Sequence, residues 1–287
     1  MLRTMIMVLA AGGVAHASLA QRAPVGFYRT GVPGGHRDTP VGGLSADGMR
    51  VIGYSARTGV GGRRDSFIWE PGAVLTFATE PAPDFFLSTY TGLSAVGNRA
   101  VGYRFDGSRS GYSAVTWSAT SDAPASLGFY SGRRDTYAWA VSGDGSTVVG
   151  HAETVSGTSA VGAPVRWTEE TGFQSLGQVF SGSNNGRALA ANFDGTLVVG
   201  TGYNDTAGFG RGFRWSQDGG YAVFPNLARI DAITPDGQWM GSMTQQSEPV
   251  RVSASGALLL LDPSPSRFEG AAPLAMSDDG RVIVGTA

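Results

Sequence analysis

Three arginine–aspartate clusters are the residues of this sequence with the clearest capacity for chemistry. Arg37-Asp38-Thr39 and Arg134-Asp135-Thr136 are near copies of each other, and Arg63-Arg64-Asp65 is of the same type. An arginine guanidinium pairs with planar anions through two parallel hydrogen bonds, so these clusters favour a site that recognises carboxylates or sulfates. The same pairs could instead brace one loop against another as surface ion pairs, and the sequence leaves both interpretations open.

Aromatic residues near the predicted loops extend the binding hypothesis to sugars. Tyr112, Tyr137 and Tyr203 could stack on sugar rings, and Arg104 adds a further loop cation. We therefore predict a binding site among the following residues: Arg37, Asp38, Arg63, Arg64, Arg104, Arg134, Asp135 and Tyr203.

The sequence lacks the residues that zinc sites, serine nucleophile motifs and phosphate-binding loops need. The chain has no cysteine, and beyond residue 20 it has only His36 and His151, too few for a closed zinc site. No G-x-S-x-G sequence is present, and the strand-like context of Gly200-Thr201-Gly202 does not provide the helix of a phosphate cradle. We predict no catalytic residue, no metal ligand and no cofactor.

The elements that must position the binding residues repeat along the chain. A Ser-x-Asp-Gly motif or a variant of it precedes a Val-Val-Gly-like strand six times, and its glycines are residues 48, 97, 145, 195, 237 and 280. Successive subtraction gives steps of 49, 48, 50, 42 and 43 residues. A period of 40 to 50 residues is typical of β-propeller blades, each built from four short antiparallel strands.

The chemistry of one repeat explains this pattern. The aspartate caps a hairpin turn, and the glycine accepts the positive φ that closes it. One aspartate in each repeat is spread around the fold, so we assign Asp47, Asp144, Asp194, Asp236 and Asp279 to turns rather than to catalysis or calcium binding. The third strand carries a tryptophan in four copies, at Trp69, Trp117, Trp167 and Trp215, and we expect its indole to cover the glycine of the Val-Val-Gly strand.

These repeats predict an all-β fold, a β-propeller of about six blades whose last blade is split or incomplete. The final copy stops after its second strand, at Ala287. Val25-Gly26-Phe27-Tyr28 resembles Leu127-Gly128-Phe129-Tyr130, which we predict to be an outer strand. We therefore expect residues 25–32 to complete the sixth blade.

The repeat resembles the HAF family of bacterial extracellular repeats, whose unit reads roughly Ser-x-Asp-Gly, Val-Val-Gly and then Ala-Phe-x-Trp. The resemblance covers residues 44–287, and the Ala-Phe pair falls on Ser66-Phe67, Ala114-Val115, Pro164-Val165 and Gly212-Phe213. The histidine of the family name is missing at these positions. The resemblance implies export and a propeller-like fold, and it implies no established catalytic activity or ligand.

The N-terminus predicts export. Residues 1–4 form a short basic start, residues 5–14 are apolar, and Ala15-His16-Ala17 and Ser18-Leu19-Ala20 both fit a small-x-small cleavage rule. We predict a removed signal peptide at residues 1–20 and a single domain at residues 21–287. No later segment approaches the roughly 20 apolar residues of a membrane span. The expected location is secreted, periplasmic or at a bacterial cell surface.

Composition limits the classes of function. The 287 residues include 44 glycines, only 15% are charged, and the formal net charge is −2, so the chain lacks the basic face of a nucleic-acid-binding protein. A hydrophobic content of 41% is enough for a core, and we expect a folded monomer.

Two functions from different classes remain. The favoured one is a secreted binding, adhesion or scaffold module that recognises an acidic or neutral glycan, or a cell-surface protein, through one loop face. The alternative is an extracellular hydrolase or lyase acting on polysaccharides, which would need paired acids on neighbouring loops such as Asp106 and Glu153. A purely structural role in a surface layer is a third possibility.

Overall fold

The computed structural model describes residues 6–8, 26–28, 34–36, 40–58, 64–73, 75–78, 85–108, 110–118, 123–156, 159–181, 183, 185–203, 210–261 and 272–286. These residues form strands and turns without any helix, so none of them belongs to a helix that could cross a membrane. The chain divides into two compact units, Met1–Gly128 (unit 1) and Phe129–Ala287 (unit 2). The all-β prediction is confirmed.

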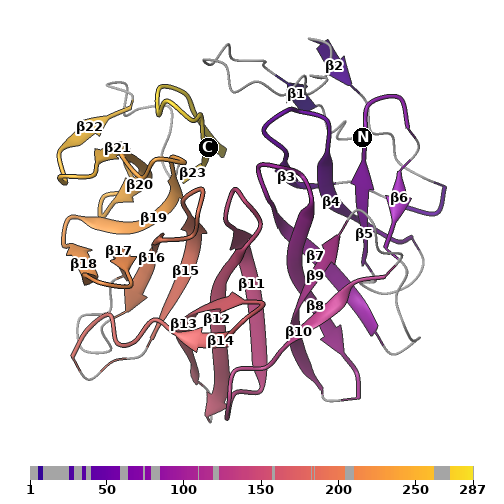
Figure 1. The fold of residues 1–287 in the computed structure, drawn as a ribbon, viewed down its shortest axis with the longest axis horizontal. Coiled ribbons are helices and arrows are strands. Elements are labelled where there is room, and N and C mark those ends of the chain that lie inside the picture. Colours follow the sequence, from indigo (N-terminus) through magenta and orange to yellow (C-terminus); the bar gives the residue numbers. More distant parts are fainter. Residues whose placement is uncertain are drawn as a thin grey trace. The chain divides into compact units, whose positions relative to one another are not determined.

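Unit 1 holds two four-stranded antiparallel sheets and one strand pair (Figure 1). The first sheet comprises β3 (Val41–Leu44), β4 (Val51–Ala56), β5 (Arg64–Trp69) and β6 (Thr76–Phe77). The second comprises β7 (Phe85–Leu93), β8 (Arg99–Asp106), β9 (Gly111–Ser118) and β10 (Ala125–Gly128). The strand pair joins β1 (Ile6–Val8), inside the predicted signal peptide, to β2 (Gly26–Tyr28), inside the segment expected to complete the last blade.

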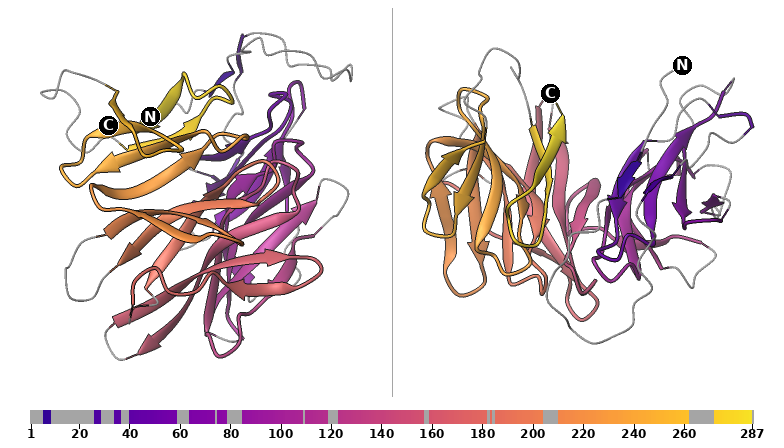
Figure 2. Two further views of the ribbon diagram at one scale, coloured as in Figure 1. Left: turned by 60° about the vertical axis from the view of Figure 1, so that its left-hand side comes forward. Right: turned by 90° about the horizontal axis from the view of Figure 1, so that it is seen from above.

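Unit 2 holds three four-stranded sheets and a final strand pair. Its strands are β11 (Asp135–Val141), β12 (Thr147–Ser156), β13 (Ser159–Thr168), β14 (Gly172–Ser175), β15 (Gly186–Ala191), β16 (Leu197–Tyr203), β17 (Gly210–Ser216), β18 (Gly220–Phe224), β19 (Leu227–Ile233), β20 (Trp239–Thr244), β21 (Pro249–Ser253), β22 (Leu258–Leu260), β23 (Ala272–Met276) and β24 (Ile283–Thr286). Each sheet pairs its strands in chain order, and each packs its first strand against the preceding sheet of the unit (Figure 2). Four antiparallel strands per repeat are therefore confirmed in five copies.

The predicted hairpin turns are present in all six copies. Every turn glycine has a positive φ, between 67° at Gly280 and 82° at Gly145. In the third copy the Ser142 hydroxyl donates to Asp144 Oδ1 at 2.6 Å, and the Ser146 N–H donates to the same oxygen at 2.9 Å. The aspartate thus satisfies the backbone of its own turn, which confirms its structural assignment.

The expected partner of the repeated glycine was wrong. Gly53 lies opposite Phe67 and Gly200 opposite Phe213, whereas the tryptophans Trp69 and Trp215 lie opposite valines. The phenylalanine, two residues before the tryptophan, therefore covers the glycine. A Cβ on Gly200 would lie closer than 3.0 Å to the carbonyl oxygen of Arg187 on the first strand, so this position needs the bare backbone.

A β-bulge on the first strand of each sheet explains that close approach. Register shifts occur at the same place in all six repeats, and the extra residues are Gly42, Thr91, Trp139, Leu189, Asp231 and Leu274. A bulge bends its strand and redirects a side chain. The bulge residue is leucine in two copies and a different residue in each of the other four, whereas the turn residues recur.

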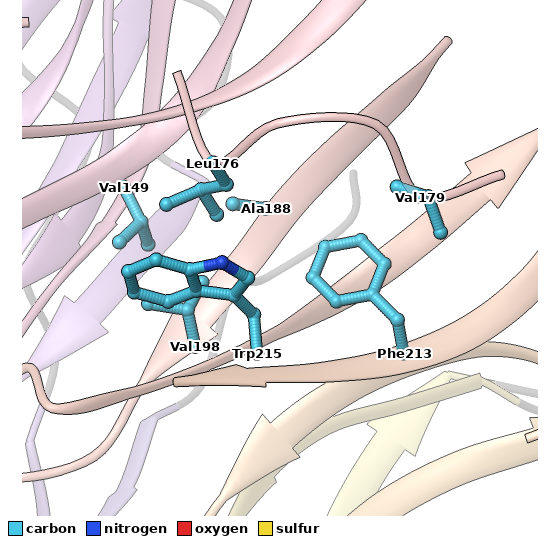
Figure 3. Close-up of a cluster of buried hydrophobic side chains, with 7 residues drawn as sticks. All are labelled: Val149, Leu176, Val179, Ala188, Val198, Phe213 and Trp215. Atoms are coloured by element: carbon cyan, nitrogen blue, oxygen red, sulfur yellow. The ribbon is translucent and has the colours of Figure 1, made fainter. Parts of the chain in front are cut away.

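The core consists of apolar clusters between successive sheets of one unit. In unit 2, Val149 of β12 packs with Val198, Phe213 and Trp215 of the next sheet (Figure 3). Leu176 and Val179 of the connecting segment close the same cluster. In unit 1, Ile52 packs with Tyr90 and Trp117 in the same manner. The Val-Val-Gly and Phe-x-Trp motifs therefore build the interfaces between sheets.

Candidate functional site

One cluster in unit 2 breaks the repeat with chemically active side chains, and we name it the β11 site. Its members are Arg134, Asp135, Tyr137, Trp139, His151, Glu153 and Arg187. Residues that recur in every repeat serve the fold, so residues that replace small or aliphatic ones in a single repeat are candidates for function. Trp139 occupies the bulge position, where the neighbouring sheet of the unit has Leu189.

The register of β11 with β12 brings the cluster together. Tyr137 lies directly opposite His151, and Asp135 lies opposite Glu153, so the four side chains lie on one face. His151 is only 2% exposed, and its ring has room because Gly162 of β13 carries no side chain beside it. This glycine thus admits a buried imidazole between the sheets.

Three rings of the β11 site are nearly parallel. The Tyr137 ring stacks on His151 with centroids 4.6 Å apart and planes 7° apart. The Trp139 ring lies beside His151 with an interplanar angle of 4°, and its Nε1–H donates to His151 Nδ1 at 2.8 Å. Tyr137 and Trp139 are half-buried, so the flat aromatic group keeps contact with solvent.

Both nitrogens of His151 are engaged. Nδ1 accepts the indole proton, which places the ring proton on Nε2, 3.6 Å from Oε2 of Glu153. Burial lowers the pKa of His151, and Arg187 lowers it further, so the imidazole is neutral at pH 7. The hydrogen bond from His151 lowers the pKa of Glu153, with further contributions from the Tyr137 hydroxyl and Arg187, so Glu153 is a carboxylate.

The predicted pair Arg134–Asp135 stands at the start of β11. Nε and Nη2 of Arg134 donate to Oδ2 of Asp135 at 2.9 and 2.6 Å. Asp135 is 1% exposed, whereas the Arg134 side chain is 49% exposed. The pair therefore braces the strand, as one interpretation of the sequence expected. The Arg134 side chain also remains partly exposed to solvent, as the anion-binding interpretation requires.

This arrangement suits binding better than acid–base catalysis. His151 has no vacant nitrogen with which to take a proton or bind a metal, because Nδ1 accepts from Trp139 and Nε2 carries hydrogen. Glu153 has a lowered pKa, the opposite of what a general acid for glycoside cleavage needs. Within the described residues no group of three or more His, Asp or Glu side chains could hold a metal ion.

The structure distributes the other predicted residues over different local roles. Arg37, Asp38 and Arg63 lie outside the described residues. Arg64 lies over the Tyr54 ring, with its Cζ 4.8 Å from the centroid. Arg104 is 6% exposed, and its Nη1 is 3.5 Å from the Pro124 carbonyl oxygen.

Tyr203 and Asp106 are held by nearby structure. The Tyr203 backbone accepts a hydrogen bond from the Ser183 hydroxyl and donates one to Asn185. Asp106, in unit 1, accepts hydrogen bonds from the backbone and hydroxyl of Ser108. It is therefore a turn residue, and it belongs to a different unit from Glu153.

Sequence reasoning missed Trp139, His151 and Arg187 as site residues. Trp139 carried a signal that was not used, because it is a tryptophan outside the Phe-x-Trp position of its repeat. His151 and Arg187 are brought to the site by the bulged register and by the packing of β15 on β11. Neither feature can be recognised in one repeat alone.

Asp231, the bulge residue of β19, has an unusual pKa. Its carboxylate accepts from Arg229 Nε at 3.0 Å and is 12% exposed. Burial raises the pKa of Asp231 to about 6, although the neighbouring Arg229 works in the opposite direction. The charged form therefore destabilises the fold at neutral pH.

Asp231→Asn is expected to stabilise the protein at pH 7.5 by up to about 2 kcal/mol, because it replaces a carboxylate that burial disfavours. A carboxyl with a raised folded pKa loses its stabilising contribution as pH rises through that value. The gain should therefore grow between about pH 4 and pH 6 and be constant above. Urea unfolding at pH 4.5 and 7.5 measures it. The control is Asp236→Ala in the same hairpin, which should destabilise at both pH values because it removes the acceptor of the Gln238 N–H; equal effects of the two variants would contradict the prediction.

Comparison with known proteins rests on fold alone. No family model matches the chain, and no curated protein matches its sequence. TolB from Acinetobacter baumannii is similar with a TM-score of 0.54 at 14% identity, over 83% of this chain and 57% of TolB. Hydrazine synthase from Kuenenia stuttgartiensis is similar with a TM-score of 0.53 at 12% identity, over 88% of this chain and 76% of the matched chain.

Prolyl oligopeptidase B from Galerina marginata is similar with a TM-score of 0.54 at 11% identity, over 82% of this chain and 36% of the enzyme. The chain thus spans just over half of TolB and about a third of the peptidase. All three likenesses are to β-propeller folds. At these identities they establish the fold and carry no activity. With its repeated four-stranded antiparallel sheets, the chain has a fold of the β-propeller class.

Proposed function

We propose that this protein is an exported β-propeller that acts as a binding or adhesion module for an extracellular polymer, with the β11 site as its contact surface. The observation that carries the proposal is a combination of side chains in one place. The half-buried rings of Tyr137 and Trp139 are parallel, and the exposed Arg187 and the Glu153 carboxylate belong to the same site. Aromatic faces pack on the apolar faces of sugars, while charged side chains hydrogen-bond to their polar substituents. A glycan is the polymer that fits both.

Catalysis is the second candidate, and the geometry favours it less. A polysaccharide hydrolase would need one carboxyl group of raised pKa beside a second carboxylate. In the β11 site, Asp135 is ion-paired with Arg134, and Glu153 has a lowered pKa. Asp231 is an acid of raised pKa, but it pairs with Arg229 rather than with another acid.

The proposed molecule is a ring of about six blades, the last one split or incomplete. Six hairpin turns and five four-stranded sheets support this count, and the strand pair β23–β24 supports an incomplete last blade. Residues 25–32 remain our proposed complement to that blade, and removal of residues 1–20 would release β2 from β1. Export follows from the predicted leader, and the HAF resemblance agrees with an extracellular location.

The test is thermal unfolding of the purified protein with a panel of acidic and neutral oligosaccharides. A ligand at 100 times its Kd stabilises by about 2.7 kcal/mol, which is a shift of several degrees. We expect a selective shift that Trp139→Ala abolishes, measured against the melting temperature of the unliganded variant. Leu189→Ala is the matched control, because Leu189 occupies the same bulge position in the next sheet.

Three outcomes would contradict the proposal. The first is the lack of a shift with every glycan, which would leave no support for glycan binding. The second is equal loss of the shift in Trp139→Ala and Leu189→Ala, which would place binding elsewhere. The third is release of reducing ends from any member of the panel, which would favour the enzyme.

A further inference from the structure

Arg187 is the one member of the β11 site whose charge has no local partner. It lies on β15, opposite Thr201 of β16, and its side chain is exposed. Within the part of the chain that the structure describes, no acid, carbonyl or ring lies at bonding distance from its guanidinium. Other arginines of unit 2 donate to an acceptor: Arg134 to Asp135, Arg166 to Gln174, Arg211 to Pro225, Arg214 to Ala254, Arg229 to Asp231 and Arg251 to Gly280.

Arg187 nevertheless acts on the β11 site. β15 packs on β11 and β12, and the backbone of Gly186, the residue before Arg187, lies beside Gly162 as the His151 ring does. The charge of Arg187 also lowers the pKa of both His151 and Glu153. The position is fixed by a rigid element, because Gly186 and Ala188 on either side are buried. A cation held beside an aromatic surface, with its hydrogen-bonding capacity unused, is suited to an external anion.

The remaining charges of the β11 site do not compete for that anion. Arg134 is matched by Asp135, His151 is neutral, and Glu153 is held by the N–H of His151 and the hydroxyl of Tyr137. Glu153 is 14% exposed and retains acceptor positions for a hydroxyl group. The site therefore offers a flat aromatic surface, one acceptor and one cation.

We propose that the β11 site binds a carboxylated glycan, with the sugar ring on Trp139, a sugar hydroxyl on Glu153 and the sugar carboxylate on Arg187. This inference rests on the proposed function and names its ligand class. A carboxylate is planar and accepts two parallel hydrogen bonds from a guanidinium, which a neutral sugar cannot do. A uronic acid polymer presents such a carboxylate on every ring and hydroxyls around it.

The experiment compares two ligands that differ at the carboxyl group alone, which is a free anion in one and a neutral methyl ester in the other. Isothermal titration calorimetry with oligogalacturonate and with its methyl ester should show about tenfold tighter binding of the free acid to the unchanged protein. Arg187→Gln should remove this preference while the ester binds as before, and Arg187→Lys should retain part of it. Arg281→Gln is the control, because Arg281 is 82% exposed and lies at a hairpin turn.

The outcomes separate this inference from the proposed function. Equal binding of acid and ester by the unchanged protein would overturn the inference and leave glycan binding intact. Equal loss in Arg187→Gln and Arg281→Gln would also overturn it, since the effect would then come from overall charge. Failure of both ligands to bind would overturn the inference, and failure of the neutral panel as well would remove the proposed function with it.

Discussion

Gly150→Ala is expected to cost unit 2 about 3 kcal/mol or more, a large fraction of the roughly 5–15 kcal/mol by which an ordinary domain is stable. The added Cβ would lie closer than 3.0 Å to the carbonyl oxygen and carbonyl carbon of Tyr137, and 3.1 Å from the Cα of Ala138. Those atoms belong to the bulged first strand, which is fixed by its pairing with β12, so neither partner can yield without breaking the sheet. Denaturant unfolding measures the loss, and the yield of soluble protein reports complete failure.

Two other positions test whether the clash is the cause. Gly34→Ala is the control, because a Cβ there meets nothing within 4 Å and its φ is not in the left-handed region. Its unfolding midpoint should be unchanged. Ser242 takes the place of this glycine in the fifth sheet, where a second register shift lies between Leu227 and Arg229 and the Ser242 hydroxyl donates to the Arg229 carbonyl. A near-normal midpoint for Gly150→Ala would show that the bulge can move. It would then be wrong that this position needs the bare backbone of glycine.

The repeat made the strands and turns predictable, because each of their positions is dictated by local chemistry. The turn that Asp144 and Gly145 form recurs with an aspartate and a glycine in five of the six copies, since a carboxylate acceptor and a positive φ are properties of the residues themselves. The role of the repeated glycine was not predictable, because it depends on a bulge that shifts the first strand by one residue. A pattern of period two does not reveal such a shift.

The candidate site was predictable only in its first residues. Arg134 and Asp135 are adjacent in the chain, so their pairing could be anticipated from sequence. Trp139 and His151 are twelve residues apart and meet because the bulge turns the indole towards the imidazole. Arg187 comes from another repeat and approaches only through the packing of successive sheets. Contacts that depend on register or packing are therefore the ones that sequence reasoning missed.

Phe213→Ala is expected to destabilise unit 2 by about 3–5 kcal/mol, the usual cost of deleting a buried aromatic ring. Phe213 is fully buried, lies against Gly200, and packs edge-on against Tyr221 with centroids 5.0 Å apart. Because Gly200 has no side chain, nothing nearby can expand into the cavity. Urea unfolding of the variant measures the cost.

Phe193→Ala is the matched control for this loss. Phe193 is 43% exposed on a hairpin turn, so removal of its ring should cost less than about 1 kcal/mol. Phe213→Leu should lose less stability than Phe213→Ala, because leucine is larger than alanine and leaves a smaller cavity over Gly200. If Phe213→Ala and Phe193→Ala lost similar stability, the ring over the glycine would not hold the sheet together. The tryptophan two residues later would then be the next residue to test, since Trp215 belongs to the same buried cluster.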